Sequence, residues 1–171
     1  MDILNYRRAW SVGAVVSISL ILAACATTQL ANDVPDTYKG ETAWLDDQTY
    51  QETGSVGRIF AVVSIDGANY DNAFRRTNQA TAGRGFSLMM VSTGRKVVAG
   101  KAQTFVLRAS HVHAAPIQAM LSSASGGNLS VEKTYMFTPE PGKRYVVKGQ
   151  LKTGETDVWL EDAQTGRKVT P

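Results

Sequence analysis

FTPEPGKRYVVKGQLKTGETDVWLEDAQTGRKV, residues 137–169, alternates strand-like runs with turn signals. Within residues 144–151, the side chains of Tyr145, Val147 and Leu151 lie an even number of positions apart, so they share one face of an extended strand. A PEPGK turn precedes this strand and a Thr-Gly turn follows it. The same pattern predicts two further strands, at residues 157–161 and 167–170.

Upstream, more short runs have the length and composition of strands. They are residues 58–65 (RIFAVVSI), 86–91 (FSLMMV), 95–98, 103–108 and 130–137. About seven or eight short strands with turn signals between them are typical of an all-β fold, here an antiparallel β-sandwich. Periodicity leaves immunoglobulin-like and transthyretin-like strand orders open. Residues 70–81 are the one helical candidate, and a long loop with a helical turn is the favoured interpretation.

The N-terminus has the composition of a secretory signal. Arg7 and Arg8 precede residues 9–24, which carry no charge and are mostly apolar. As a helix, these residues would span about 24 Å, short of the ~30 Å hydrocarbon core of a bilayer. A cleaved export signal is therefore favoured over a permanent transmembrane helix. The single cysteine, Cys25, stands directly after this segment.

Leu22-Ala23-Ala24-Cys25 resembles the lipobox of bacterial lipoproteins. The resemblance implies that a diacylglyceryl group is joined to the Cys25 thiol, that residues 1–24 are removed, and that the new amino group is acylated. Several acyl chains anchor a protein stably where a single chain does not. In this family an Asp after the cysteine retains the protein in the inner membrane. Ala26 and Thr27 follow here, so the resemblance implies an outer-membrane anchor with the body facing the periplasm.

Residues 25–55 are expected to form a lipidated acidic tether, and residues 56–171 the β-sandwich domain. The tether holds six acids against one base, Lys39, and no strand or helix period persists in it. Its one apolar cluster, residues 43–45 (AWL), is expected to dock against the domain. Fully extended, the tether would reach up to roughly 100 Å, so the body would not need to touch the membrane.

Charge is distributed unevenly over the predicted domain. Residues 72–131 contain no acid and seven bases: Arg75, Arg76, Arg84, Arg95, Lys96, Lys101 and Arg108. A surface of one sign attracts anionic partners, although the bases could equally be spread over several strands, or the acidic tether could fold back on them. We take Tyr70, Arg75, Arg76 and Arg84 as candidate binding residues, because long loops on sandwiches often carry recognition and Tyr with Arg is a common hot-spot composition.

Residues for catalysis are not apparent. The sequence has no Gly-x-Ser-x-Gly nucleophile elbow, and lipid would consume the only thiol. His111 and His113 are the only histidines, and their spacing places both on one face of a strand. Two imidazoles are too few for a metal site unless the fold adds ligands. The sequence therefore predicts no enzyme, no metal and no cofactor, with a metal-handling protein or enzyme centred on these histidines as the alternative.

Residues 137–169 as a whole are similar to the closing hairpins of small β-sandwich envelope lipoproteins of unknown function. The shared features are an aromatic residue, a Pro-Gly-Lys turn, a Tyr-Val strand, a Trp-containing strand and an Asp-x-x-Thr-Gly turn. The resemblance implies the fold and no activity. We expect an outer-membrane lipoprotein with a non-enzymatic binding or structural role. Peptidoglycan or another envelope protein is the candidate partner, and the compartment excludes nucleic acid. A subunit of a secretion machine remains an alternative.

Overall fold

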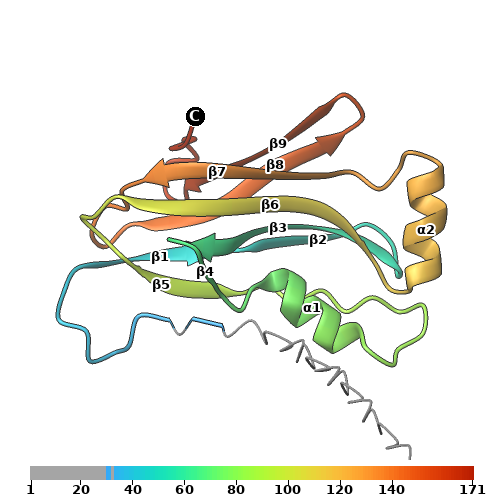
Figure 1. The fold of residues 1–171 in the computed structure, drawn as a ribbon, viewed down its shortest axis with the longest axis horizontal. Coiled ribbons are helices and arrows are strands. Elements are labelled where there is room, and N and C mark those ends of the chain that lie inside the picture. Colours follow the sequence, from blue (N-terminus) through green and yellow to red (C-terminus); the bar gives the residue numbers. More distant parts are fainter. Residues whose placement is uncertain (1–29, 32) are drawn as a thin grey trace, which may run out of the picture.

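Nine strands and two helices follow one another in residues 30, 31 and 33–171, the part of the chain that this computed structural model describes (Figure 1). In chain order they are β1 (Thr42–Asp46), β2 (Gln48–Gln51), β3 (Val56–Ile65), β4 (Ala68–Asn69), α1 (Ala73–Thr81), β5 (Gly94–Val98), β6 (Gln103–His113), α2 (Pro116–Ala124), β7 (Ser130–Phe137), β8 (Arg144–Lys152) and β9 (Glu155–Asp162). The predicted signal segment, residues 1–24, and Cys25 lie outside the described residues.

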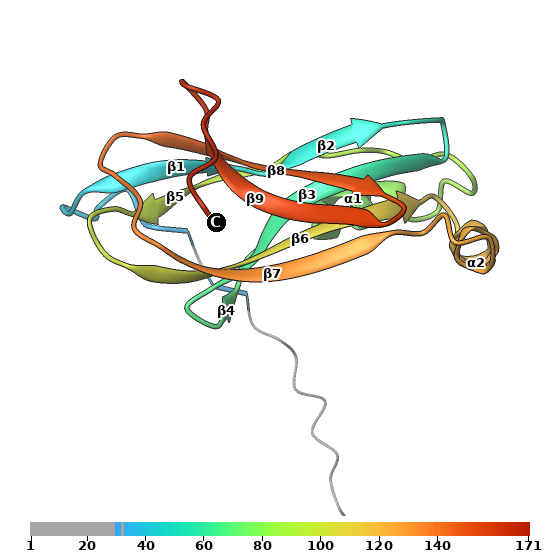
Figure 2. The same ribbon diagram turned by 90° about the horizontal axis from the view of Figure 1, so that it is seen from above.

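The strands form two sheets that pack face to face (Figure 2). One sheet has the order β5-β1-β8-β9, and the other has the order β2-β3-β6-β7 with β4 added on β3. All pairings are antiparallel except that of β1 with β8, which is parallel. The prediction of an all-β sandwich is confirmed, and the parallel pair is an addition to it.

The core lies between the two sheets and is filled by the alternating inward residues of each. Phe60, Phe105 and Leu107 enter it from one sheet and are at most 1% exposed. Val147 and Leu160 meet them from the other sheet and are fully buried. This burial of alternate apolar side chains is the physical reason for the period of two in the sequence.

The sandwich begins earlier in the chain than expected. β1 and β2 lie within residues 25–55, so part of the predicted tether belongs to the two sheets. Ala43 and Leu45 are buried in the core, which confirms the expected docking of this apolar cluster, while Trp44 is 37% exposed. Further upstream, Ala31 donates its N–H to the Asn69 carbonyl and forms a bridge with Tyr70. The described chain is therefore held on the body from its first residues onward.

Residues 86–91 do not form the expected strand. Their backbone N–H groups bond elsewhere: Met89 donates to the hydroxyl of Thr81 and Val91 to that of Thr77, each at 3.0 Å. Both threonines lie on α1 and are buried. The apolar segment thus runs along a helix rather than in a sheet, because side-chain hydroxyls supply the acceptors that a neighbouring strand would have supplied.

Residues 73–81 form a full helix, where a loop with a helical turn was favoured. Asn72 caps α1, since its side chain accepts the N–H of Arg75 at 3.2 Å. The helix covers the outer face of the β3 sheet, where Ala73 and Phe74 pack against Ile59 and Ala61. β3 is therefore covered on both faces, which explains its unbroken apolar run.

Two more features differ from expectation. α2 was not predicted; it starts at Pro116, and the side chain of Gln118 accepts the N–H of Ala115 at 3.3 Å. Residues 167–170 form only one isolated bridge, between Lys168 and Glu161, in place of a strand. No helix of the described residues is long and apolar enough to cross a membrane.

Candidate functional site

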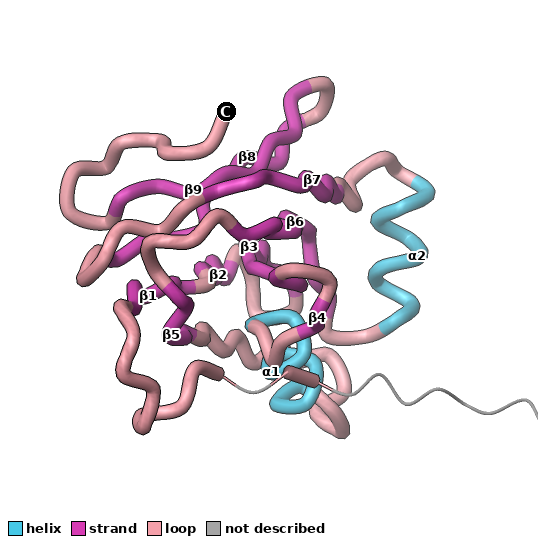
Figure 3. Tube along the Cα trace, turned by 60° about the vertical axis from the view of Figure 1, so that its left-hand side comes forward, coloured by secondary structure: helices cyan, strands magenta, loops and turns pink. Residues whose placement is uncertain are grey.

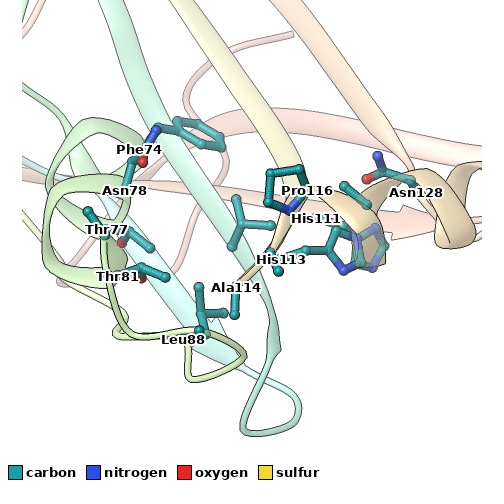
Figure 4. Close-up of a pocket in the computed structure, with 16 residues that line it drawn as sticks. Phe74, Thr77, Asn78, Thr81, Leu88, His111, His113, Ala114, Pro116 and Asn128 are labelled. Atoms are coloured by element: carbon teal, nitrogen blue, oxygen red, sulfur yellow. The ribbon is translucent and has the colours of Figure 1, made fainter.

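A hollow of about 620 Å³ lies between α1 and α2, where β6 ends (Figure 4). Phe74 and Thr77 line it from α1, and Pro116 and Ala119 line it from the start of α2. Figure 3 shows α1 below the strands and α2 beside the ends of β6 and β7. The volume falls within the ~300–1,000 Å³ that small-molecule pockets occupy. None of the residues that line the hollow is Asp, Glu, Lys or Arg, so it suits an uncharged group.

His111 lies at the C-terminal end of β6 and faces this hollow. Its Nδ1 accepts the N–H of Leu129 at 3.2 Å. A neutral His111 therefore carries its proton on Nε2, which lies 3.9 Å from Oε1 of Glu52. The same carboxylate oxygen lies 2.6 Å from Nε of Arg58. His111 is thus hydrogen-bonded through Nδ1, whereas Nε2 lies beyond hydrogen-bond distance of Glu52.

Both ring nitrogens of His113 are buried, and the Asn128 side chain is the hydrogen-bonding group that lies beside them. The Oδ1 atom of Asn128, which lines the same hollow, is buried as well. Burial lowers the pKa of His113 and the nearby His111 lowers it further, whereas the hydrogen bond with the Asn128 side chain and the charge of Glu52 oppose that shift. A neutral imidazole has one donor and one acceptor nitrogen, so the Asn128 side chain leaves one of them for a ligand.

A second hollow, of about 520 Å³, lies on the other side of α2. His111 and His113 line both hollows, while Ala119 faces the first and Ser122 the second. α2 therefore stands between two hollows that meet at the histidines. The predicted placement of both histidines on one strand agrees with the structure.

The structure adds no third metal ligand to this pair. Among the described residues, no group of three or more His, Cys, Asp or Glu side chains is arranged to hold a metal ion. Glu52, the acid closest to His111, is engaged by Arg58.

The predicted binding residues Tyr70 and Arg75 lie together. Both line a separate hollow of about 630 Å³, which also includes Leu30 and Phe74. Tyr70 is half-buried, and its ring centroid lies 5.7 Å from the guanidinium carbon of Arg95. Tyr70 therefore has a structural role beside its place in this hollow.

Arg76 and Arg84 lie elsewhere. Nε of Arg76 lies 2.5 Å from Oδ2 of Asp71, and the side chain lines a hollow with Asp33. Arg84 donates from Nε to the carbonyl of Ala80 at 2.8 Å and lines yet another hollow. The four predicted residues thus face three different hollows and do not form one contact surface around a single cleft.

Acids of the predicted tether pair with bases of the body. The pairs are Asp36 with Lys96, Asp46 with Arg144, Asp47 with Arg95 and Glu52 with Arg58. The acidic segment therefore does fold back on the basic domain. Much of the charge asymmetry seen in the sequence is used inside the fold and is not left for a partner.

Sequence reasoning missed the hollow between the helices. Its walls come from two helices, of which one was rejected and the other not predicted. The available signals were Pro116, which suits a first helical position, and Gln118 two residues later.

No protein-family model, curated protein or solved structure matches this chain.

Proposed function

We propose that this chain is a non-enzymatic, lipid-anchored binding protein of the bacterial outer membrane, attached through Cys25 and facing the periplasm. Its sandwich binds an uncharged, partly apolar group of an envelope partner in the hollow between α1 and α2. Peptidoglycan or another envelope protein supplies that group.

The observation that carries the binding proposal is an uncharged hollow whose wall holds a buried ring nitrogen of His113 without a partner among the described residues. Leaving a buried polar group without a partner costs about 1–3 kcal/mol. Oδ1 of Asn128 can pair with only one ring nitrogen of His113, so the other nitrogen is in this situation, and a ligand that bonds to it would recover that free energy. The Phe74 and Ala119 side chains provide apolar contact beside it.

The anchor is tested on the protein purified from bacterial membranes. The N-terminal peptide is expected to start at Cys25 and to carry the mass of the diacylglyceryl and acyl groups. The Cys25→Ser variant is expected to keep residues 1–24, because the signal is cut only after lipid has been added. An unmodified thiol at residue 25 of the native protein would contradict the anchor.

Binding in the hollow is tested by photo-crosslinking in intact bacteria. A photo-reactive amino acid replaces Asn78, an exposed residue that lines the hollow, or Gln79, its exposed neighbour on α1 that does not. Light is expected to produce adducts from position 78 and not from position 79. His113→Phe keeps an aromatic ring of similar size but removes both nitrogens, so it should abolish the adducts. Equal adducts from both positions, or adducts that survive His113→Phe, would contradict the proposal.

A further inference from the structure

α2 turns its large apolar side chains outward. Ile117, Met120 and Leu121 are 52%, 68% and 66% exposed, and their spacing of three and four residues places them on one face. The side toward the body carries Gln118 and Ser122, which are half-buried. No residue of this helix is buried. The usual arrangement of a surface helix, apolar face inward and polar face outward, is reversed here.

The chain segment around α2 also lacks charge. Residues 109–131, which include α2, contain no Asp, Glu, Lys or Arg. Phe86, in the loop after α1, is 64% exposed and lines a hollow with Ser55 from the β2–β3 turn. That turn is joined to the end of β6, because Ala114 donates its N–H to the Ser55 carbonyl. Phe86 and α2 are thus held at the same end of the sandwich, and both expose apolar surface there.

The described chain begins beside α1. Leu30 lines a hollow with Phe74 and Asn78, and these two residues also line the hollow that Ala119 of α2 faces. Leu30 lies beside Tyr70 and Asn72, at the N-terminal end of α1, whereas α2 stands beyond the other end of that helix (Figure 1). The five residues from Cys25 to Leu30 span at most about 18 Å. A lipid on Cys25 would therefore hold the body close to the membrane surface, in contrast to the long reach expected for a 30-residue tether.

We propose that the apolar face of α2, together with Phe86, docks on the phospholipid bilayer that holds the lipid anchor. The proposal rests on the lipid anchoring of Cys25 and specifies how the anchored body lies. An uncharged apolar helix face suits the boundary between headgroups and acyl chains, where side chains bury without desolvating a charge. In this orientation the hollow between α1 and α2 opens beside the membrane surface.

The experiment uses the full, lipidated chain with one added cysteine, because lipid consumes Cys25 and leaves the new thiol as the only free one. Met120→Cys places an environment-sensitive fluorophore on the α2 face. Ala102→Cys is the control label. Ala102 is exposed and directly precedes β6, whereas α2 follows the opposite end of that strand. The 11 residues of β6 separate the two sites by about 36 Å. Each protein is reconstituted in phosphatidylethanolamine–phosphatidylglycerol vesicles whose acyl chains carry bromine, which quenches nearby fluorophores.

Bromine is expected to quench the label at position 120 several-fold more than the label at position 102. Ile117→Lys together with Leu121→Lys should remove most of this excess quenching. Met136→Lys is the control, since Met136 is 78% exposed on β7, toward the end of the sandwich away from α2. Fluorescence emission should shift to shorter wavelength at position 120 only.

Equal quenching at both positions in a protein whose mass confirms the lipid would overturn the docking and leave the anchor intact. A free thiol at residue 25 would overturn both. Shielding of position 120 that appears only after envelope proteins are added would also overturn the docking, because the face would then bind a protein.

Discussion

Asp47 and Arg95 form an ion pair that is closed off from solvent, with side chains 0% and 1% exposed and a contact of 3.0 Å. Asp47 also accepts the N–H groups of Val62 and Ala73 and the hydroxyl of Thr93. Burial raises the pKa of Asp47, and Arg95 and these donors oppose that effect. On Arg95, by contrast, Nε and Nη1 are buried without a partner among the described residues. The Asp47 carboxylate, between β1 and β2, is thus bonded to residues of β3, α1 and β5.

Removing Asp47 is expected to lower the free energy of unfolding more than removing Arg95. Asp47→Leu leaves a buried guanidinium without its counter-ion, which costs about 3–5 kcal/mol. Arg95→Met leaves Asp47 with two amides and a hydroxyl, so we expect a smaller loss of unfolding free energy. Urea unfolding followed by tryptophan fluorescence compares the two variants and the double variant. An equal loss for both single variants would contradict this asymmetry.

Asp162 should make the stability of the protein depend on pH in the acid range. Its side chain is 6% exposed and accepts the N–H groups of Gln164 and Thr165 and the ammonium of Lys143. The Thr165 amide and Lys143 lower its pKa from 3.8 to about 2. Because the folded pKa lies below the unfolded one, the stabilisation is complete above about pH 4 and is lost as the pH falls toward 2.

We therefore expect Asp162→Asn to be less stable than the native protein at pH 7, with a difference that shrinks below pH 4 and disappears near pH 2. Urea unfolding at a series of pH values measures it. Glu155→Gln, at an exposed position in the β8–β9 hairpin, is the control and should show no such convergence. A difference that stays constant with pH would show that the charge of Asp162 is not responsible.

Among the elements, β8 depends on a glycine at the contact between the sheets. A Cβ on Gly149 would lie 2.4 Å from the carbonyl oxygen of Asp157 and 2.8 Å from the ring of Phe60. Only a residue without a side chain lets Phe60 of the opposite sheet approach the β8 backbone so closely. Gly149 is thus a packing requirement within a strand that otherwise alternates regularly.

Gly149→Ala is expected to lower the free energy of unfolding by about 1–3 kcal/mol, the usual cost of overpacking. Gly54→Ala, in the β2–β3 turn, is the matched control, because nothing lies within 4 Å of the added Cβ and the expected change is within about 0.5 kcal/mol. Thermal and urea unfolding measure both variants. Similar losses in the two would mean that the loss comes from the backbone and not from packing.

The elements also show which parts of the fold were predictable. β3, β7, β8 and β9 were found because their apolar side chains and flanking turns are local signals. Residues 86–91 have the composition of a strand, but the acceptors for their N–H groups come from Thr77 and Thr81, which local pattern does not reveal. α2 was missed because its nine residues include no charged side chain, so the sequence shows little contrast between an apolar and a polar helix face.

At the scale of the whole molecule, the acid-rich and base-rich parts of the chain are complementary. Asp36, Asp46 and Glu52 each reach a base that lies elsewhere in the sequence. The sequence showed that the two parts differ in charge, but pairing across sheets depends on topology. The candidate site was likewise only partly predictable. Both histidines were recognised in the sequence, whereas the hollow that they line depends on α1 and α2 lying on either side of the end of β6.

The parallel pairing of β1 with β8 has a consequence for the order in which the protein acquires its structure. Asp46 and Arg144 meet across this pairing although 98 residues separate them in the chain. A polypeptide that emerges from a ribosome or an export channel with its N-terminus first presents β1 long before β8 exists. Because β1 lies between β5 and β8 in its sheet, that sheet stays half-built until about five-sixths of the chain has emerged. Contacts between residues so far apart in the chain slow folding. Until β8 pairs with it, the edge of β1 is therefore open to pairing with strands of other chains.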